Sequence, residues 1–187
     1  MSFNMEKLLD PEAALRLFAI AAQERSGMDL LMTLTNKGTA IEGESVRGSE
    51  RKDVGTKALD VMGYLLIGGA QIAPGTSEAK VSTSHLIVVR RCDAATASIA
   101  SLLKSQSEDV KVNLVAFKAG GDSSDQPTMS IDIEKGRVAH FAVLTVGALG
   151  SIPCEIVAFA HQRLTIRSAP QAKTGQRGAE RICNFNE

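Results

Sequence analysis

Aromatic residues are scarce in this sequence, which holds no Trp, one Tyr and six Phe among 187 residues. Proteins that bind single-stranded nucleic acid commonly stack the bases on aromatic side chains, and the sequence has little material for such a platform. It also lacks an excess of charge, because 21 Lys and Arg residues balance 21 Asp and Glu residues. Phosphate backbones are bound by a positive field. We therefore expect no nucleic acid among the partners.

Closely spaced cysteines are missing as well. Cys92, Cys154 and Cys183 lie far apart and form no CxxC pair, whereas structural zinc sites usually draw their ligands from such pairs. An odd and scattered set of three fits reduced thiols better than a disulfide framework. Arg90 and Arg91 precede Cys92, and neighbouring positive charge can lower the pKa of a thiol. Even so, a buried or incidental thiol explains Cys92 better than a nucleophile does.

The common motifs of cofactor and nucleophile chemistry do not occur. The sequence contains no GxGxxG, no GxxxxGK[ST] and no GxSxG, so it offers no dinucleotide fingerprint, phosphate-binding loop or nucleophile elbow. His85, His140 and His161 fall in predicted strands, but they lack the H-x-H or HExxH spacing of a metal site. We expect ordinary histidines, no metal, no cofactor and no catalytic residue.

No apolar run reaches the roughly 20 residues that a transmembrane helix needs. The stretch Ala13–Ala22 is apolar apart from Arg16, as in the hydrophobic part of a signal peptide. The residues before it, however, carry more negative than positive charge, whereas a signal peptide begins with positive charge. We expect neither membrane insertion nor a signal peptide.

The first periodic segment is a helix predicted over residues 10–27. Asp10 can cap the exposed amides, Pro11 takes the first helical position, and Ser26-Gly27 ends the helix. Its apolar residues cover more than one narrow face, so this helix needs to be buried against its own chain or a neighbour. We treat residues 1–27 as an N-terminal helical extension and residues 28–187 as a separate domain.

From Met28 onward apolar residues recur at every second position, which is typical of half-buried strands. One short helix interrupts them, where Asp93 can cap a segment with apolar residues at helical spacing. Short strands, turn residues between them and a single helix predict a β-barrel or sandwich. The predicted strands are 28–35, 41–46, 57–67, 80–91, 110–118, 129–134, 138–146 and 154–167, the helix is 94–105, loops cover 47–56, 68–75 and 119–126, and Gly136 begins a turn or bulge.

Charged residues of both signs gather around the predicted loop 47–56. A solvated loop with mixed charges explains them, and so does a surface that docks on a partner through complementary charges. From the charges alone, both interpretations stay open. The acidic members are Glu42, Glu44, Glu50 and Asp53, and the basic members are Arg47, Arg51 and Lys52.

Three motifs occur in an order that is fairly specific to one family. Residues 41–46 (IEGESV) carry an I-x-G-E-S pattern, and the charged loop follows them. Residues 117–121 (FKAGG) close a later strand with K-A-G-G, and residues 168–175 (SAPQAKTG) open the tail with P-Q-x-x-x-G. In this ordered set the chain resembles the Hcp family, the tube protein of bacterial type VI secretion systems. The resemblance covers residues 28–187.

The resemblance implies a mainly β protein, a compact β-barrel of two packed antiparallel sheets with one flanking α-helix, to which this chain adds the N-terminal helix. It implies hexameric rings that stack into a hollow tube, which a contractile sheath drives out together with a spike and effector proteins. It implies no catalysis and no cofactor. Such a subunit is cytoplasmic before assembly and is exported through the secretion machine without a signal peptide.

The resemblance also implies roles for two segments. The loop after the matched Glu-Ser pair corresponds to the loop that bridges stacked rings, and the helix from Ala94 to Lys104 corresponds to the single outer helix of the family. The expected ring-stacking residues are Arg47, Glu50, Arg51, Lys52 and Asp53.

The residues themselves are compatible with a tube. Ring subunits joined head to tail need two different edges, and apolar positions on two predicted strands are candidates for them. A channel wall needs a polar face on alternating strand positions. The interface candidates are Tyr64, Leu65, Leu66, Phe141 and Val143, and the channel candidates are Thr33, Ser82, Ser84, Asn113, Ser130 and Asp132.

Some features depart from the family pattern. Members often carry Trp in the strand that here spans Leu59–Ile67, where this chain offers only Tyr64. The usual aromatic tail is reduced to residues 184–186, and the N-terminal helix is additional. These departures indicate a divergent branch.

Two alternatives stay open beside the secretion tube. A phage-like tail tube would share the fold and the ring assembly. A small-ligand-binding β-barrel, or an enzyme built in one, would instead be a monomer or dimer with a closed apolar pocket and convergent polar groups.

Overall fold

The computed structural model describes most of the chain from Met28 onward. The predicted N-terminal helix 10–27 and the predicted loop 119–126 lie outside the described residues. The described residues are 28–49, 54–55, 57–72, 75, 79–118, 127–145, 152–170 and 178–186.

The described chain is mainly β, as predicted. Its elements are β1 (Met28–Asn36), β2 (Thr39–Ile41), α2 (Val46–Ser49), β3 (Leu59–Val61), β4 (Gly63–Leu65), β5 (Gly68–Ile72), β6 (Ala79–Thr83), β7 (Leu86–Arg91), α3 (Ala95–Ser105), β8 (Val110–Lys118), β9 (Met129–Thr145), β10 (Pro153–Ala160), β11 (Arg163–Ser168) and β12 (Arg181–Asn186).

All strand pairs are antiparallel, and the main order is β2-β1-β8-β9-β10-β7-β4. The long strand β9 joins two layers, because its first half pairs with β8 and β11 and its second half pairs with β10. It bends near Gly136, where Lys135 has a φ of +49° and the register with β8 shifts. The bulge predicted at Gly136 is therefore confirmed, inside one strand rather than between two.

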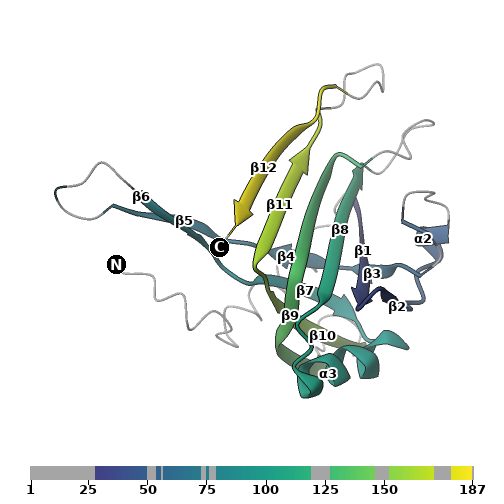
Figure 1. Cartoon of the computed structure of the whole chain (residues 1–187). Coiled ribbons are helices and arrows are strands. Elements are labelled where there is room, and N and C mark those ends of the chain that lie inside the picture. Colours follow the sequence, from purple (N-terminus) through teal and green to yellow (C-terminus); the bar gives the residue numbers. More distant parts are fainter. Residues whose placement is uncertain are drawn as a thin grey trace.

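The two sheets pack face to face around one core, as predicted (Figure 1). Leu30 and Met32 of β1 and Leu114 of β8 contribute from one sheet, and Val88 of β7 and Phe159 of β10 from the other. No continuous ladder closes this barrel among the described strands. Instead β3 pairs with β1 and β4 pairs with β7, so that the chain itself connects the two sheets at the corner between them.

Helix α3 confirms the predicted helix, and its ends follow its sequence. The Asp93 carboxylate accepts a hydrogen bond from the backbone N–H of Ala95 (2.8 Å), and the Thr96 hydroxyl accepts one from the backbone N–H of Asp93 (3.0 Å). The helix ends at Gln106, which adopts the left-handed conformation. Ile99 and Leu102 are buried against the core at one end of the sheets (Figure 1).

Three predicted strands are each two strands in the structure. Residues 57–67 form β3 and β4, residues 80–91 form β6 and β7, and residues 154–167 form β10 and β11. At each break the chain passes from one sheet to another. At the second break the Ser84 backbone N–H donates to the Ile67 carbonyl at 2.8 Å. The Ser84 hydroxyl accepts from the Ile67 N–H and donates to the His85 carbonyl, both at 2.9 Å.

Two further predictions are wrong in detail. The strand expected over residues 41–46 ends at Ile41, because Gly43 and Ser45 donate their backbone N–H groups to the carbonyls of Lys57 and Ala58 instead of continuing a ladder. Gly68 and Gly69, expected in a loop, begin β5. Strands β5 and β6 form a separate two-stranded sheet that projects from the body (Figure 1).

No helix among the described residues is long and apolar enough to cross a membrane.

Candidate functional site

The sheet formed by β1, β8, β9, β11 and β12 turns one side of its strands into the main core, and part of its opposite face is polar. Elsewhere on that opposite face, Leu31, Val115 and Phe117 pack with Val54 and Ala58 in a separate buried apolar cluster. Strand register places one residue from each of the five strands in a single row across this face. The row runs Thr33, Asn113, Asp132, Thr165, Asn184.

Hydrogen bonds and ion pairs connect the side chains of this polar face. The Asn113 amide donates to Asp132 at 2.5 Å, and Arg167 forms an ion pair with the same carboxylate. Arg163 pairs with Glu134 at 3.5 Å, on the exposed side of the neighbouring row. Each of these acids thus has a basic partner nearby, which leaves the face polar without a strong field of one sign.

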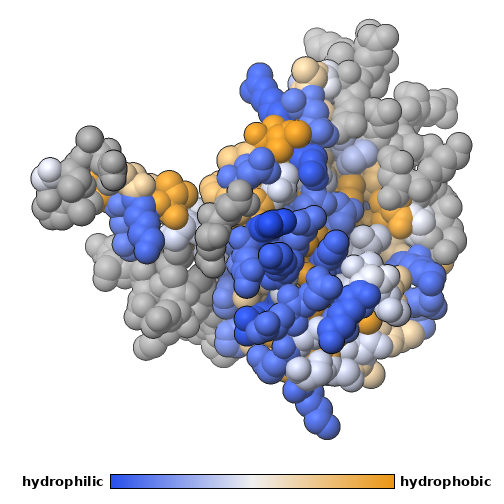
Figure 2. Space-filling model, viewed as in Figure 1, coloured by the Kyte–Doolittle hydropathy of each residue, from blue (hydrophilic) through white to orange (hydrophobic). Residues whose placement is uncertain are grey.

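The polar face surrounds an open hollow of about 340 Å³. Figure 2 shows hydrophilic residues gathered over β8, β9 and β11 on this side of the molecule. The hollow is open and is lined mainly by polar and charged side chains together with Val112 and Ile133, whereas a small-molecule pocket is usually enclosed and mostly apolar.

The structure brings most of the predicted channel residues together on this polar face. Thr33, Asn113, Ser130 and Asp132 share it. Ser84 does not, because it is buried and hydrogen-bonded at the start of β7, and Ser82 lies on the projecting strand β6. Thr165 was not among the predicted channel residues, although the alternation of Thr165 with Leu164 and Ile166 indicates a residue that faces away from the core.

A second candidate surface begins at the I-x-G-E-S motif, where backbone contacts fix the segment from Gly43 to Ser49. The N–H of Gly43 donates to Lys57 and the N–H of Ser45 donates to Ala58, both at 3.2 Å. A Cβ atom on Gly43 would lie 2.3 Å from the Ala58 carbonyl oxygen. The glycine of the motif is thus required by close packing of two backbones.

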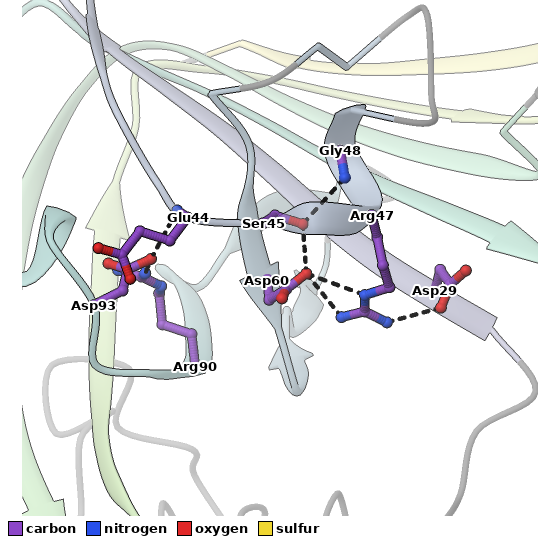
Figure 3. Close-up of polar contacts among 8 residues, drawn as sticks. All are labelled: Asp29, Glu44, Ser45, Arg47, Gly48, Asp60, Arg90 and Asp93. Atoms are coloured by element: carbon purple, nitrogen blue, oxygen red, sulfur yellow. Dashed lines mark hydrogen bonds and ion pairs between the residues drawn. The ribbon is translucent and has the colours of Figure 1, made fainter.

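Five residues, which we call the anchor cluster, fasten the same segment through polar contacts: Asp29, Ser45, Arg47, Gly48 and Asp60 (Figure 3). The Ser45 hydroxyl accepts from the Gly48 N–H at 3.1 Å and donates to Asp60 at 2.7 Å. Arg47 donates to the same Asp60 oxygen from Nε (3.1 Å) and Nη2 (2.9 Å), and to Asp29 from Nη1 (2.7 Å). Partial burial by itself would lower the pKa of Arg47, but the two carboxylates outweigh it and raise that pKa.

A buried ion network supports the same segment from the other side. The backbone N–H of Glu44 donates to Asp93 at 3.4 Å, and Asp93 pairs with Arg90 at 2.5 Å (Figure 3). Arg90 also pairs with Glu155 at 2.6 Å, and both side chains are almost completely buried. Burial raises the pKa of the Glu155 carboxyl, and Arg90 offsets only part of that effect. Nothing in the sequence indicated this network, because Glu44 and Glu155 lie 49 and 65 positions from their partners Asp93 and Arg90.

The structure describes only one of the five predicted ring-stacking residues. Arg47 belongs to the anchor cluster, and Glu50, Arg51, Lys52 and Asp53 lie outside the described residues. The role of these residues between rings stays a prediction.

The predicted interface residues occupy two strands. Tyr64 and Leu65 lie on β4, Leu66 follows it, and Phe141 and Val143 lie on the second half of β9. Tyr64, Leu66 and Phe141 pack against the main core, and burial raises the pKa of Tyr64. Val143 is different, since 56% of its surface is exposed. An interface role for these residues stays a prediction.

The histidines and Cys92 lie apart from the two candidate surfaces described above. The rings of His85 and His140 lie 6.2 Å apart, and His161 Nε2 lies 3.1 Å from the Ser84 carbonyl oxygen. Among the residues that the structure describes, no group of His, Cys, Asp and Glu is placed to hold a metal ion. Burial raises the pKa of Cys92 and outweighs the lowering that its neighbour Arg90 contributes.

Comparison with known proteins supports the fold. No family profile and no curated protein matches the sequence. Among solved structures, the chain is similar to a type six secretion system protein (19% identity, TM-score 0.68, 85% of this chain and 95% of that chain). It is similar to Hcp1 from Salmonella typhimurium (16% identity, TM-score 0.62, 84% of this chain and 95% of that chain). It is also similar to the secreted protein Hcp3 from Pseudomonas aeruginosa (14% identity, TM-score 0.55, 86% of this chain and 99% of that chain). The predicted resemblance is therefore confirmed as a shared fold, which spans nearly the whole length of those proteins.

Proposed function

We propose that this chain, which has the Hcp fold, is a structural tube subunit of a type VI secretion system. In this proposal six copies form a ring, and rings stack into a hollow tube that carries effector proteins. The observation that carries the proposal is the polar face of the β1-β8-β9-β11-β12 sheet. It lies on a fold whose solved examples include secreted Hcp proteins.

The polar face has the properties that a channel wall needs. Its side chains hydrogen-bond to one another, as Asn113 does with Asp132 and Thr165 with Asn184, and polar groups of this kind suit a wall that faces an aqueous channel. Pairing of Arg163 with Glu134 and of Arg167 with Asp132 keeps the local net charge small. A cargo protein would then meet no strong electrostatic trap on its way through.

The proposed role needs no catalytic residue and no cofactor. Its expected partners are further copies of the chain, a sheath, a spike and effector proteins, with no nucleic acid and no membrane insertion. The subunit is expected in the cytoplasm before assembly and outside the cell after export through the machine.

The ring is tested by light scattering coupled to size-exclusion chromatography of the full chain. We expect a mass near six times the 19.8 kDa of one chain, and annular particles in negative-stain electron microscopy. A stable monomer at high concentration would overturn the proposal and favour a ligand-binding barrel. The hollow on the polar face would then be the first place to search for the ligand.

A further inference from the structure

The segment from Gly43 to Ser49 leads directly into the predicted ring-stacking residues, and it is held at both ends. Glu44 is tied to Asp93 through its backbone, and Ser45 and Arg47 are tied to Asp60 (Figure 3). Just before these ties the segment packs too closely on Ala58 to tolerate a Cβ atom at Gly43. The same holds at Gly48, where a Cβ would lie 2.6 Å from the Ala58 Cβ.

Arg47 is the predicted stacking residue whose side chain the structure describes, and its guanidinium binds carboxylates of its own chain. All three of its nitrogens donate hydrogen bonds, two to Asp60 and one to Asp29. These partners lie on β3 and β1, two paired strands of one sheet. A contact between Arg47 and another ring would have to compete with charge-assisted bonds that are already formed.

We infer that Arg47 is a positioning residue that acts with Asp60 and Ser45 to fix the start of the ring-stacking loop, and that it is not itself a contact between rings. The inference rests on the proposed function, because it assigns a task within ring stacking. Asp60 carries the greatest weight in it, since one of its oxygens accepts from both Ser45 and Arg47.

The decisive comparison is between Asp60→Asn and Arg47→Gln in the full chain. A direct contact made by Arg47 would survive or strengthen in Asp60→Asn, because that variant removes the charge bound by two of the guanidinium nitrogens and leaves Asp29 as the remaining carboxylate of the anchor cluster. A positioning role predicts the same defect in both variants, and no further defect in the double variant, because each single change already releases the segment. Ser45→Ala serves as a milder third variant that leaves every charge in place.

Glu42→Gln is the matched control. It removes an ion pair with Lys57 (2.6 Å) beside the same segment, but this pair is exposed to solvent and separate from the anchor cluster. Circular dichroism and thermal melting of every variant test whether the barrel still folds.

Three measurements read the result: ring mass by light scattering, stacked rings by electron microscopy, and hydrogen exchange of the backbone amides of residues 43–49. We expect hexameric mass in all variants, fewer stacks in Asp60→Asn and Arg47→Gln, and amide exchange about tenfold faster there than in wild type and Glu42→Gln. Loss of stacking in Arg47→Gln alone, or unchanged exchange in Asp60→Asn, would overturn the inference. Absence of rings in the wild type would overturn the proposed function instead, while the exchange data would still decide whether the cluster fixes the segment.

Discussion

Gly43 illustrates how a single residue of the I-x-G-E-S motif acts. Its backbone lies against the carbonyl of Ala58, where any side chain would overlap that oxygen. Glycine is thus needed at this position of the motif for steric reasons. Ser45 of the same motif is needed for hydrogen bonding, since its hydroxyl accepts from the Gly48 N–H and donates to Asp60.

Replacing Gly43 with alanine is expected to lower the free energy of unfolding by about 1–3 kcal/mol, because one of two backbones has to move. The measurement is the midpoint of urea unfolding. Gly68→Ala is the control, since a Cβ there meets no atom within 4 Å. Equal midpoints for the two variants would contradict the steric explanation.

Glu155 presents a different problem, because a carboxylate is buried beside Arg90 in the core-facing side of a sheet. Burial raises the folded-state pKa of Glu155 above its ordinary value of 4.5. At pH values between 4.5 and the folded-state pKa, the Glu155 carboxyl is protonated in the folded state and largely deprotonated in the unfolded state. The contribution of Glu155 to stability is therefore complete below pH 4.5 and falls as the pH rises through the folded-state pKa.

Glu155→Gln cannot release this proton, so it removes that pH dependence. We expect the unfolding free energy of the wild type, minus that of the variant, to decrease as the pH is raised from about 4.5 to 7. Urea unfolding of both proteins across this range provides the measurement. A difference that increases with pH would mean that Arg90 dominates over burial.

Among the elements, α3 depends most visibly on one residue at its start. Asp93 caps the helix, pairs with Arg90 and receives the backbone N–H of Glu44. The Thr96 hydroxyl accepts the reciprocal bond from the backbone N–H of Asp93, and the Thr96 side chain also interacts with Glu155 and Cys92.

Asp93→Ala should therefore destabilise the protein more than Thr96→Ala. Loss of a helix cap costs about 1 kcal/mol on average, and Asp93→Ala loses two further contacts in addition to the cap. Thermal unfolding of both variants tests the order, and a larger loss in Thr96→Ala would contradict the arrangement described for the helix start.

For the N-terminal extension, residues 1–27, the expectation rests on the sequence alone. Apolar residues on more than one face of the predicted helix 10–27 need cover from the barrel or from a neighbouring subunit. We expect deletion of residues 1–27 to reduce ring formation or solubility, as measured by light scattering and sedimentation. An unchanged, soluble ring would remove this hypothesis.

For the assembly, the molecule offers two surfaces with different expected tasks. The second half of β9 presents Val143 with 56% of its surface exposed, and α2 presents Val46 with 75% exposed at the start of the loop expected between rings. Both are apolar and of equal size, so they form a matched pair for testing which surface joins subunits within a ring.

Val143→Glu is expected to convert rings to monomers, because a charge would be buried between subunits without a partner. Val46→Glu is expected to leave the ring mass unchanged, since that residue is expected on the stacking side. Light scattering distinguishes the two. A ring that persists in Val143→Glu would remove this strand from the interface.

Local patterns in the chain were enough to predict β1, β8 and α3. Leu30, Met32 and Leu34 recur at every second position and face the main core, and the cap at Asp93 involves only residues within three positions. Such signals depend on adjacent residues and survive in any context. The same alternation did not reveal the breaks at Met62 and Ser84, because a chain can change sheets without changing its periodicity.

The partners of Arg47 and Arg90 depended instead on how the strands came together. Arg47 meets Asp60 and Asp29, which are 13 and 18 positions away, and Arg90 meets Glu155, 65 positions away. From the sequence, Arg47 was as free to face another ring as its charged neighbours, and only the pairing of β1 with β3 brings the two carboxylates to it. The register between distant strands is set by the packing of the whole core, so no short stretch of the chain contains it.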